Sequence, residues 1–253
     1  MKSTERFSNR VADYARCRPG YPAALGDWLV RHCGLKPGDA AADIGCGTGL
    51  FTRELLRRGL RVHGVEPNGP MREAGAQALA EFGAAFSAHD GSGEATGLPD
   101  ACVRLACAAQ AFHWFDPVAA RREFARILVP GGHAALIWNV RGEDSPFLRG
   151  YDALLQKHAP EYAKSGIPAQ ANLDTITPFF APAGFEQRNF DYAQHFDYDG
   201  LRGRLLSSSY APAAGTPGHE PMLDDLRKLF DEHQHDGLVE FAYQTRAFVG
   251  VLR

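Results

Sequence analysis

The stretch that decides the fold is AADIGCGTG, residues 41–49. A short apolar run ends at the acidic Asp43, three glycines alternate with other residues, and a helical pattern begins at Leu50. This order predicts a strand, a tight turn and the N-terminus of a helix. Glycine is needed where the backbone takes a positive φ or must approach a ligand closely, because it has no Cβ. We therefore expect the loop to form a floor on which a nucleotide-like ligand can lie.

The spacing of these glycines distinguishes between ligands. The dinucleotide fingerprint is G-x-G-x-x-G, with a pyrophosphate at the helix N-terminus. Here the third glycine, Gly49, comes one residue early, and Leu50 stands where the fingerprint requires glycine. A nicotinamide-dependent oxidoreductase is therefore disfavoured. A glycine turn in some other doubly wound protein stays open as an alternative.

Composition narrows the classes further. The chain has 253 residues, 45% hydrophobic and 23% charged, with a net charge of −3, which is ordinary for a globular protein and does not indicate a nucleic-acid partner. Its five cysteines include no C-x-x-C pair, so neither a disulfide scaffold nor a zinc ribbon is expected. We see no apolar signal core and no run near the ~18 apolar residues of a membrane span. We predict a cytoplasmic protein without a metal or a membrane partner.

Strands and helices alternate along the first 140 residues. Strands are predicted at 61–65, 84–88, 103–109 and 133–140, and helices at 50–58, 69–82 and 117–128. Pro130-Gly131-Gly132 is expected to end the last of these helices. Two later strands, 184–196 and 238–249, are expected to close the edge as a hairpin. The pattern predicts an α/β, doubly wound, mostly parallel seven-stranded sheet with one antiparallel edge strand and a helical cap from both chain ends.

The D-x-G-x-G-x-G pattern resembles motif I of class I S-adenosylmethionine-dependent methyltransferases, in which the loop carries no phosphate. This resemblance implies an acidic residue at the end of the next strand, where it holds the ribose hydroxyls. Glu66 stands there, 23 residues after Asp43. Asp43 itself matches the family position that contacts the loop backbone or the methionine ammonium, and charge-assisted hydrogen bonds suit both roles.

The resemblance extends to four further segments, 7–22, 90–99, 109–116 and 126–132. Together they are similar to methyltransferases of type 11 and to trans-aconitate methyltransferase-like proteins, which implies a Rossmann-like methyltransferase fold. Two residues depart from the family pattern. Gly93 replaces the usual alanine, and Arg104 replaces a common aspartate at the start of the fourth strand.

The resemblance implies a cofactor site and an N-terminal lid. Tyr14 and Arg18 are expected in the lid, with an aromatic face for the sulfonium and a cation for the carboxylate. The alternative explanation for these residues is that the N-terminal segment simply packs against the rest of the protein. The implied cofactor-binding residues are Tyr14, Arg18, Asp43, Gly45, Cys46, Gly47, Gly49, Glu66, Pro67, Met71, Ser92, Gly93 and Gln110.

Acceptor residues are expected just past the carboxyl ends of the fourth and fifth strands. His113 is the candidate base, because an unperturbed pKa near ~6.5 suits proton transfer. Methyl transfer can also proceed without any base. His113, Trp114, Trp138 and Asn139 are predicted to line the acceptor pocket, with simple packing as the alternative. No Asn/Asp-Pro-Pro-Tyr/Phe and no Pro-Cys sequence occurs, which argues against the usual nucleobase methylations and favours a small acceptor.

We therefore predict one methyltransferase domain over 1–253, with a lid at 1–35, a cofactor core at 36–140 and a substrate side at 141–253. The cofactor would be S-adenosylmethionine, with S-adenosylhomocysteine as product, and the acceptor a carboxylate, hydroxyl or carbon of a small molecule. A monomer or homodimer is expected. A non-catalytic S-adenosylmethionine-binding regulator or scaffold is the alternative.

Overall fold

A computed structural model describes residues 18–159, 162, 171–208 and 210–252. Its strands are β1 (Ala40–Ile44), β2 (Arg61–Val65), β3 (Phe86–His89), β4 (Val103–Ala109), β5 (Leu128–Arg141), β6 (Glu186–Phe196) and β7 (Val239–Val251). Its helices are α2 (Ala23–His32), α3 (Leu50–Leu56), α4 (Gly69–Ala78), α5 (Pro117–Ile127), α6 (Pro146–His158), α8 (Leu173–Phe180), α9 (Tyr198–Leu206) and α10 (His219–His233). Two 3₁₀ helices, η2 (Ala80–Ala85) and η3 (Phe112–Trp114), complete the described elements.

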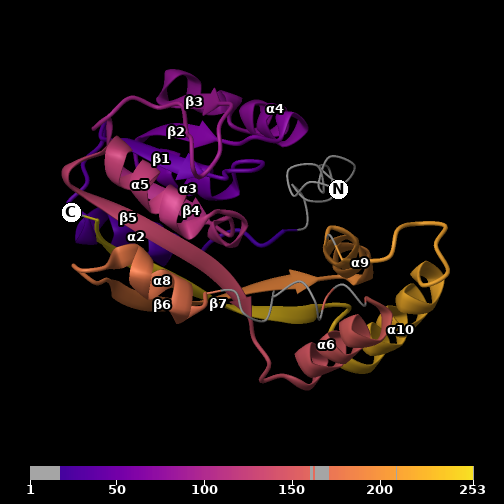
Figure 1. Ribbon diagram of the computed structural model, residues 1–253. Helices are drawn as coiled ribbons and strands as arrows, with labels where there is room; N and C mark the ends of the chain where they lie inside the picture. Colours follow the sequence, from indigo (N-terminus) through magenta and orange to yellow (C-terminus); the bar gives the residue numbers. More distant parts are fainter. Residues whose placement is uncertain (1–17, 160–161, 163–170, 209, 253) are drawn as a thin grey trace.

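Within the described residues, all seven strands join one sheet in the order β3-β2-β1-β4-β5-β7-β6 (Figure 1). The pairs β1–β2, β2–β3, β1–β4 and β4–β5 are parallel. Strand β7 runs antiparallel to both of its neighbours, β5 and β6. This confirms the predicted mostly parallel seven-stranded α/β sheet, and the two late strands close its edge as an antiparallel pair.

The start of β5 differs from the prediction. We expected the strand to begin at His133, after Pro130-Gly131-Gly132, but it begins at Leu128. Four residues of β5, which include the Pro-Gly-Gly, lie opposite Arg104 alone, so this segment is a bulge within the strand. Arg104, the departure from the family aspartate, is half exposed and forms an ion pair with Asp39 at 3.5 Å.

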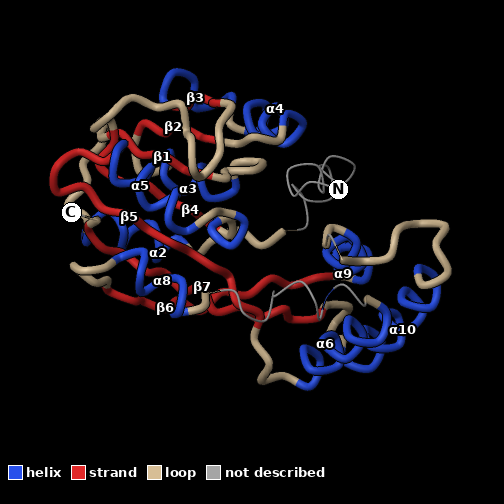
Figure 2. The backbone as a smooth tube through the Cα atoms, viewed as in Figure 1, coloured by secondary structure: helices blue, strands red, loops and turns tan. Residues whose placement is uncertain are grey.

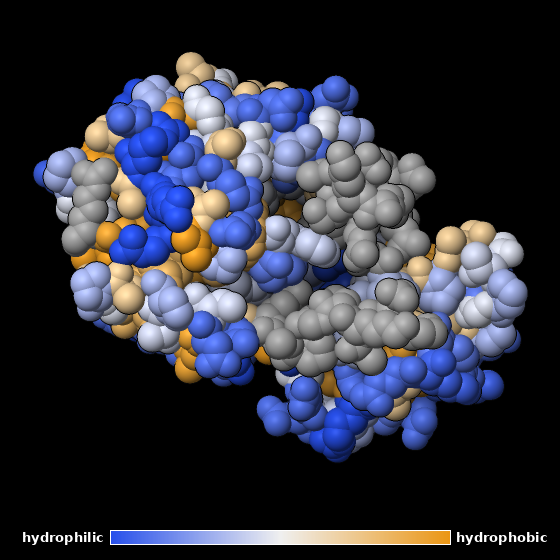
Figure 3. Space-filling model, viewed as in Figure 1, coloured by the Kyte–Doolittle hydropathy of each residue, from blue (hydrophilic) through white to orange (hydrophobic). Residues whose placement is uncertain are grey.

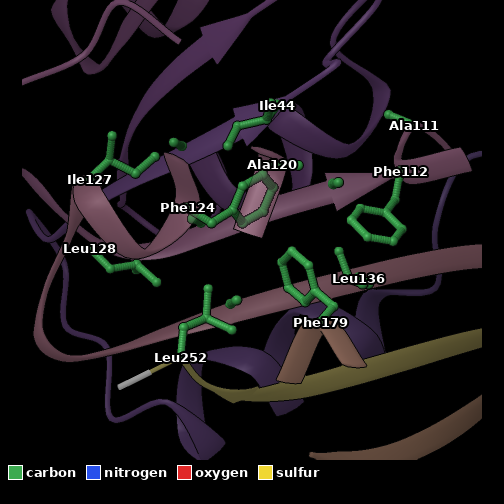
Figure 4. Packing of buried hydrophobic residues seen from close by; sticks show 14 of the residues in the cluster. Ile44, Ala111, Phe112, Ala120, Phe124, Ile127, Leu128, Leu136, Phe179 and Leu252 are labelled. Carbon is green, nitrogen blue, oxygen red and sulfur yellow. The ribbon is translucent and has the colours of Figure 1, made fainter. Parts of the chain in front are cut away.

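Buried apolar residues cover both faces of the sheet. On β5, Leu136 packs with α5 and α8 on one face, while Ile137 packs with α2 and α3 on the other. Figure 4 shows the first of these clusters, where Phe179 of α8 lies near Phe112 and Phe124, with ring centroids 4.9 Å and 5.5 Å away. Helices on both faces make the sheet doubly wound, as predicted.

A third buried cluster lies where the long strands β6 and β7 extend beyond the rest of the sheet. Helices α6, α9 and α10 lie beside this end of the two strands (Figure 2). They pack around wholly buried side chains such as Tyr151, Leu226 and Phe241. We call these three helices the helical unit. Hydrophilic residues predominate over α6 and α10 on the face shown in Figure 3, so these helices turn their apolar sides inward.

None of the described helices combines the length and the apolar content that crossing a membrane requires.

Candidate functional site

The glycine loop lies between β1 and α3, as predicted. Gly45, Gly47 and Gly49 have φ of 74°, 56° and 83°, in the left-handed region that favours glycine. A Cβ on Gly45 would lie 2.5 Å from the Cβ of Ala111, and one on Gly49 would lie 2.6 Å from Cδ1 of Leu79. The loop therefore admits no side chain at these two positions.

Glu66 holds this loop from the end of β2. Its buried carboxylate accepts the backbone N–H groups of Gly47 and Asn68, each at 2.9 Å. Arg72 donates to the Glu66 carbonyl oxygen at 2.6 Å. Burial raises the pKa of Glu66, while the two N–H donors act in the opposite direction. The predicted acid thus lies against the glycine loop, with Pro67 exposed beside it.

Asp43 is the second buried acid of the site. Its Oδ2 accepts a hydrogen bond from the Thr52 hydroxyl at 2.6 Å. Its Oδ1 is buried and has no hydrogen-bond partner in the described part of the chain. Burial raises the pKa of Asp43 to about 7; the Thr52 hydrogen bond lowers it and the charge of Glu66 raises it. An unsatisfied buried acceptor is costly, so a cationic or N–H-bearing ligand would be favoured here.

Phe115 brings two predicted cofactor segments together. A Cβ on Gly93 would lie 2.4 Å from its ring, and a Cβ on Gly45 would lie 3.4 Å from it. The ring therefore occupies the place of an alanine methyl, which explains why glycine stands at position 93. Met71 lies across the loop, with its Cε 3.2 Å from the place of a Cβ on Gly47.

Cys46 and Ser92, also predicted to bind cofactor, bond within the protein. The Ser92 hydroxyl accepts the N–H groups of Glu94 and Ala95 at 3.3 Å and 3.2 Å. Burial raises the pKa of Cys46, so its side chain stays a thiol and gives no support for a nucleophilic role. Among the described residues, no three His, Cys, Asp or Glu side chains are arranged to hold a metal ion.

Gln110 and Asn139 join the ends of β4 and β5 to the N-terminal segment. Gln110 has a φ of 56°, uncommon for a residue other than glycine, and its Nε2 donates to the Asn139 carbonyl oxygen at 3.0 Å. The Asn139 side chain donates to the Gly20 carbonyl at 2.9 Å and accepts from the Thr245 hydroxyl at 2.6 Å. A positive φ such as that of Gln110 is a form of backbone strain that is common at functional sites.

The predicted acceptor residues are placed differently from one another. His113 and Trp114 are both exposed on η3, with ring centroids 4.9 Å apart. Trp138 is only 2% exposed and packs edge-on against Phe112 and Phe248. This position agrees with simple packing, the alternative to a role in the acceptor pocket. The structure thus brings His113 and Trp114 together and places Trp138 in the core.

His113 carries a perturbed pKa. Although part of its surface is exposed, much of the imidazole is surrounded by protein, and this desolvation lowers its pKa. The positive charge of Arg18 acts in the same direction, and the pKa falls to about 4. The neutral imidazole therefore prevails at neutral pH.

Of the two predicted lid residues, Tyr14 lies outside the described residues. The Arg18 guanidinium donates from Nη2 to the Ser207 carbonyl oxygen at 3.0 Å, just beyond the end of α9. This bond joins the start of the described chain to the helical unit.

Sequence reasoning missed Thr52, Phe115 and Thr245, which support Asp43, the glycine loop and Asn139. Phe115 lies inside the segment 109–116, but its spacing does not indicate a contact with Gly93. Thr52 and Thr245 carried no signal, because each acts on a residue that only the folded chain brings near.

A doubly wound sheet, a glycine loop without the third fingerprint glycine, and a buried acid at the end of β2 are the features that the resemblance to class I methyltransferases implies. Comparisons with known proteins agree. A family model described as "Methyltransferase domain" matches residues 42–136. An uncharacterized methyltransferase of Mycobacterium tuberculosis is 30% identical over 227 residues, which cover 90% of this chain and 86% of the relative.

More distant comparisons cover almost the whole chain. An uncharacterized methyltransferase-like protein of Schizosaccharomyces pombe is 26% identical over 252 residues, covering 96% of this chain and 93% of that protein. A solved structure from Anaeromyxobacter dehalogenans, "a Putative Type II Methyltransferase", has a TM-score of 0.69 at 23% identity, over 93% of this chain and 98% of that one. The chain belongs to the class I S-adenosylmethionine-dependent methyltransferases and is an enzyme of that family. Membership implies the use of S-adenosylmethionine.

Gly45→Ala is expected to weaken S-adenosylhomocysteine binding at least about tenfold. The new methyl would meet Ala111, and alanine would have to hold a φ of 74°, at a cost of about 1–3 kcal/mol. Calorimetric titration measures the effect. Gly69→Ala is the matched control, since a Cβ there has no atom within 4 Å and should leave binding unchanged. Equal affinities in the two variants would contradict this account of the loop.

The raised pKa of Asp43 predicts that both the stability of the protein and its affinity for cofactor depend on pH. Its folded pKa of about 7 lies above the ordinary value of 3.8, so the folded protein binds more protons than the unfolded chain between these values. The contribution of Asp43 to the free energy of unfolding is therefore full below about pH 4 and is lost as the pH rises through 7. If the ionised carboxylate binds an ammonium, affinity for S-adenosylhomocysteine should rise from pH 6 to 8.

Melting temperatures and dissociation constants between pH 5 and 8 test both trends. Asp43→Asn should flatten each of them relative to the wild type, because the amide does not titrate. A variant that kept both wild-type slopes would show that another group is responsible.

Proposed function

We propose that this methyltransferase binds S-adenosylmethionine over the β1 loop and transfers the methyl group to a small-molecule acceptor. The observation that carries the proposal is the unpaired Oδ1 of Asp43, a buried anionic acceptor next to a loop that excludes side chains. When bound, S-adenosylmethionine supplies a methyl group already activated by the sulfonium charge. In this proposal Asp43 receives the methionine ammonium and Glu66 receives the ribose hydroxyls.

We assign the remaining predicted residues to the same cofactor site. Backbone at the three glycines forms the floor, and Met71 borders it. We assign Tyr14 and Arg18 to the cover over the methionine end. The other proposed cofactor contacts are Cys46, Pro67, Ser92, Gly93 and Gln110.

The chain's main task in the reaction is alignment and the exclusion of water. Holding two reactants in position can contribute ~7–11 kcal/mol to lowering a barrier in favourable systems. We propose His113 as the proton acceptor, with Trp114 and Asn139 as further residues of the acceptor pocket. It is neutral at pH 7, but its pKa of about 4 makes it a weak base. Alignment therefore supplies the larger share of the rate enhancement.

Two observations support a small acceptor. The chain carries a net charge of −3, unlike the basic surface that a nucleic-acid substrate favours. The Arg18–Ser207 hydrogen bond also ties the helical unit to Arg18, which we assign to the cover of the cofactor site. One domain over 1–253, a monomer or homodimer, and a cytoplasmic location without nucleic-acid or membrane partners stay predictions.

Transfer of tritiated methyl from S-adenosylmethionine tests the acceptor class. The enzyme is incubated separately with a cell extract filtered to remove macromolecules, with total RNA and with denatured protein. We expect label to enter the small-molecule fraction only. Heat-denatured enzyme serves as the inactive control. Label in RNA or protein but not in the filtrate would overturn the small-molecule proposal.

A further inference from the structure

Arg204, on the last turn of α9, is a buried cation without a carboxylate partner among the described residues. Its side chain is 8% exposed. Nε donates to the Tyr243 hydroxyl at 3.0 Å and Nη1 to the Ser208 hydroxyl at 3.2 Å. The guanidinium also lies over the Phe241 ring, 5.5 Å from its centroid. In the described part of the chain no acidic side chain forms an ion pair with it.

This arrangement is costly in the absence of a ligand. A buried charge is normally paired, because neither hydroxyl groups nor an aromatic face replaces the full hydration of a guanidinium. Arginine has five N–H donors, and the two bonds to Tyr243 and Ser208 use two of them. Nη2 forms no hydrogen bond to a described residue, so an N–H-bearing edge of the cation is left for another acceptor.

A second, partly buried arginine in the same cluster differs from Arg204 because it has a carboxylate partner. Arg141, at the end of β5, forms an ion pair with Asp152 and donates to the Tyr162 hydroxyl at 2.6 Å. Its guanidinium lies 5.3 Å from the centroid of the Tyr151 ring. The same cluster therefore supplies a carboxylate to Arg141 and none to Arg204.

Two phenolic hydroxyls belong to the aromatic cluster that Arg204 contacts. The Tyr151 hydroxyl is wholly buried and has no hydrogen-bond partner among the described residues. The Tyr243 oxygen accepts from Arg204, which leaves its own O–H available to donate. Tyr151 and Tyr243 both contact the Phe241 ring, at centroid distances of 5.0 Å and 5.1 Å. One cation and two phenolic donors around one aromatic ring form a set suited to an anion.

The cluster lies on the acceptor side of the sheet. Tyr243 is directly opposite Arg141 in the β5–β7 register, two residues beyond Asn139. The Arg204 carbonyl accepts the Ser207 hydroxyl at 2.8 Å, and the Ser207 carbonyl accepts Arg18. In open α/β sheets ligands bind beyond the carboxyl ends of the strands, which is where these residues stand.

We infer that the methyl acceptor carries a carboxylate that binds Arg204, with the Tyr151 and Tyr243 hydroxyls as additional donors. This inference rests on the proposed small-molecule acceptor and names its anchoring group, not the atom that is methylated. A carboxylate carries one negative charge and neutralises one guanidinium, whereas a phosphate dianion would leave excess charge buried. The planar guanidinium edge also matches the two oxygens of a carboxylate.

The first test uses the protein alone. Arg204→Met removes an uncompensated cation and should leave the melting temperature unchanged or raise it, while the affinity for S-adenosylhomocysteine stays within about twofold. Arg141→Met is the matched control and should lower the melting temperature by several degrees, because it unpairs Asp152. A similar loss of stability in both variants would show that Arg204 is structural and would overturn the inference.

The second test repeats the transfer of tritiated methyl to the cell filtrate, with the filtrate chemically treated before the enzyme is added. Amidation of carboxylates with a carbodiimide and ammonia should abolish labelling by the wild type, whereas phosphatase treatment should not. Arg204→Met should lose about tenfold or more of the labelling, as expected for one hydrogen-bonded charge. Labelling that survives amidation, or that is lost only after phosphatase treatment, would overturn the inference that the acceptor carries a carboxylate. No labelling of the untreated filtrate would instead refute the small-molecule proposal itself.

Discussion

The carboxylate of Glu66 is the contact on which the site depends. Glu66 directly follows β2, and its carboxylate accepts the N–H of Gly47, in the loop after β1, and the N–H of Asn68. Asn68 in turn caps α4 by accepting the N–H of Met71 at 3.0 Å. One buried anion therefore fixes two strand ends, the glycine loop and the start of a helix, and without it the left-handed loop would lack its support.

Unbalanced buried charges mark the two ends of the proposed reaction path. Asp43 and Glu66 leave the cofactor side rich in negative charge, which suits a ligand with ammonium and sulfonium groups. Arg204 leaves the helical unit with an unpaired positive charge, which suits an anionic acceptor. Since an unpaired buried charge is costly, complementary ligands would stabilise the protein at both ends.

The parts of the fold and of the site that can be predicted are those that depend on short stretches of sequence. The limits of β4 and the acids Asp43 and Glu66 follow from short patterns of apolar, glycine and acidic residues. The bulge that begins β5, the core position of Trp138 and the Arg204 cluster do not, because they arise from pairings between distant residues. Thr245 reaches Asn139 across 106 positions of sequence, and no short pattern indicates such a contact.

Calorimetric titration with S-adenosylhomocysteine, with NADH in parallel, tests the central claim most directly. The account predicts one-site binding of S-adenosylhomocysteine and none of NADH. Glu66→Ala should weaken that binding at least about tenfold, because it removes a charged hydrogen-bond acceptor. Glu73→Ala, which alters an exposed acid on α4, should leave it intact. No binding to folded wild-type protein, or equal binding by both variants, would contradict the account.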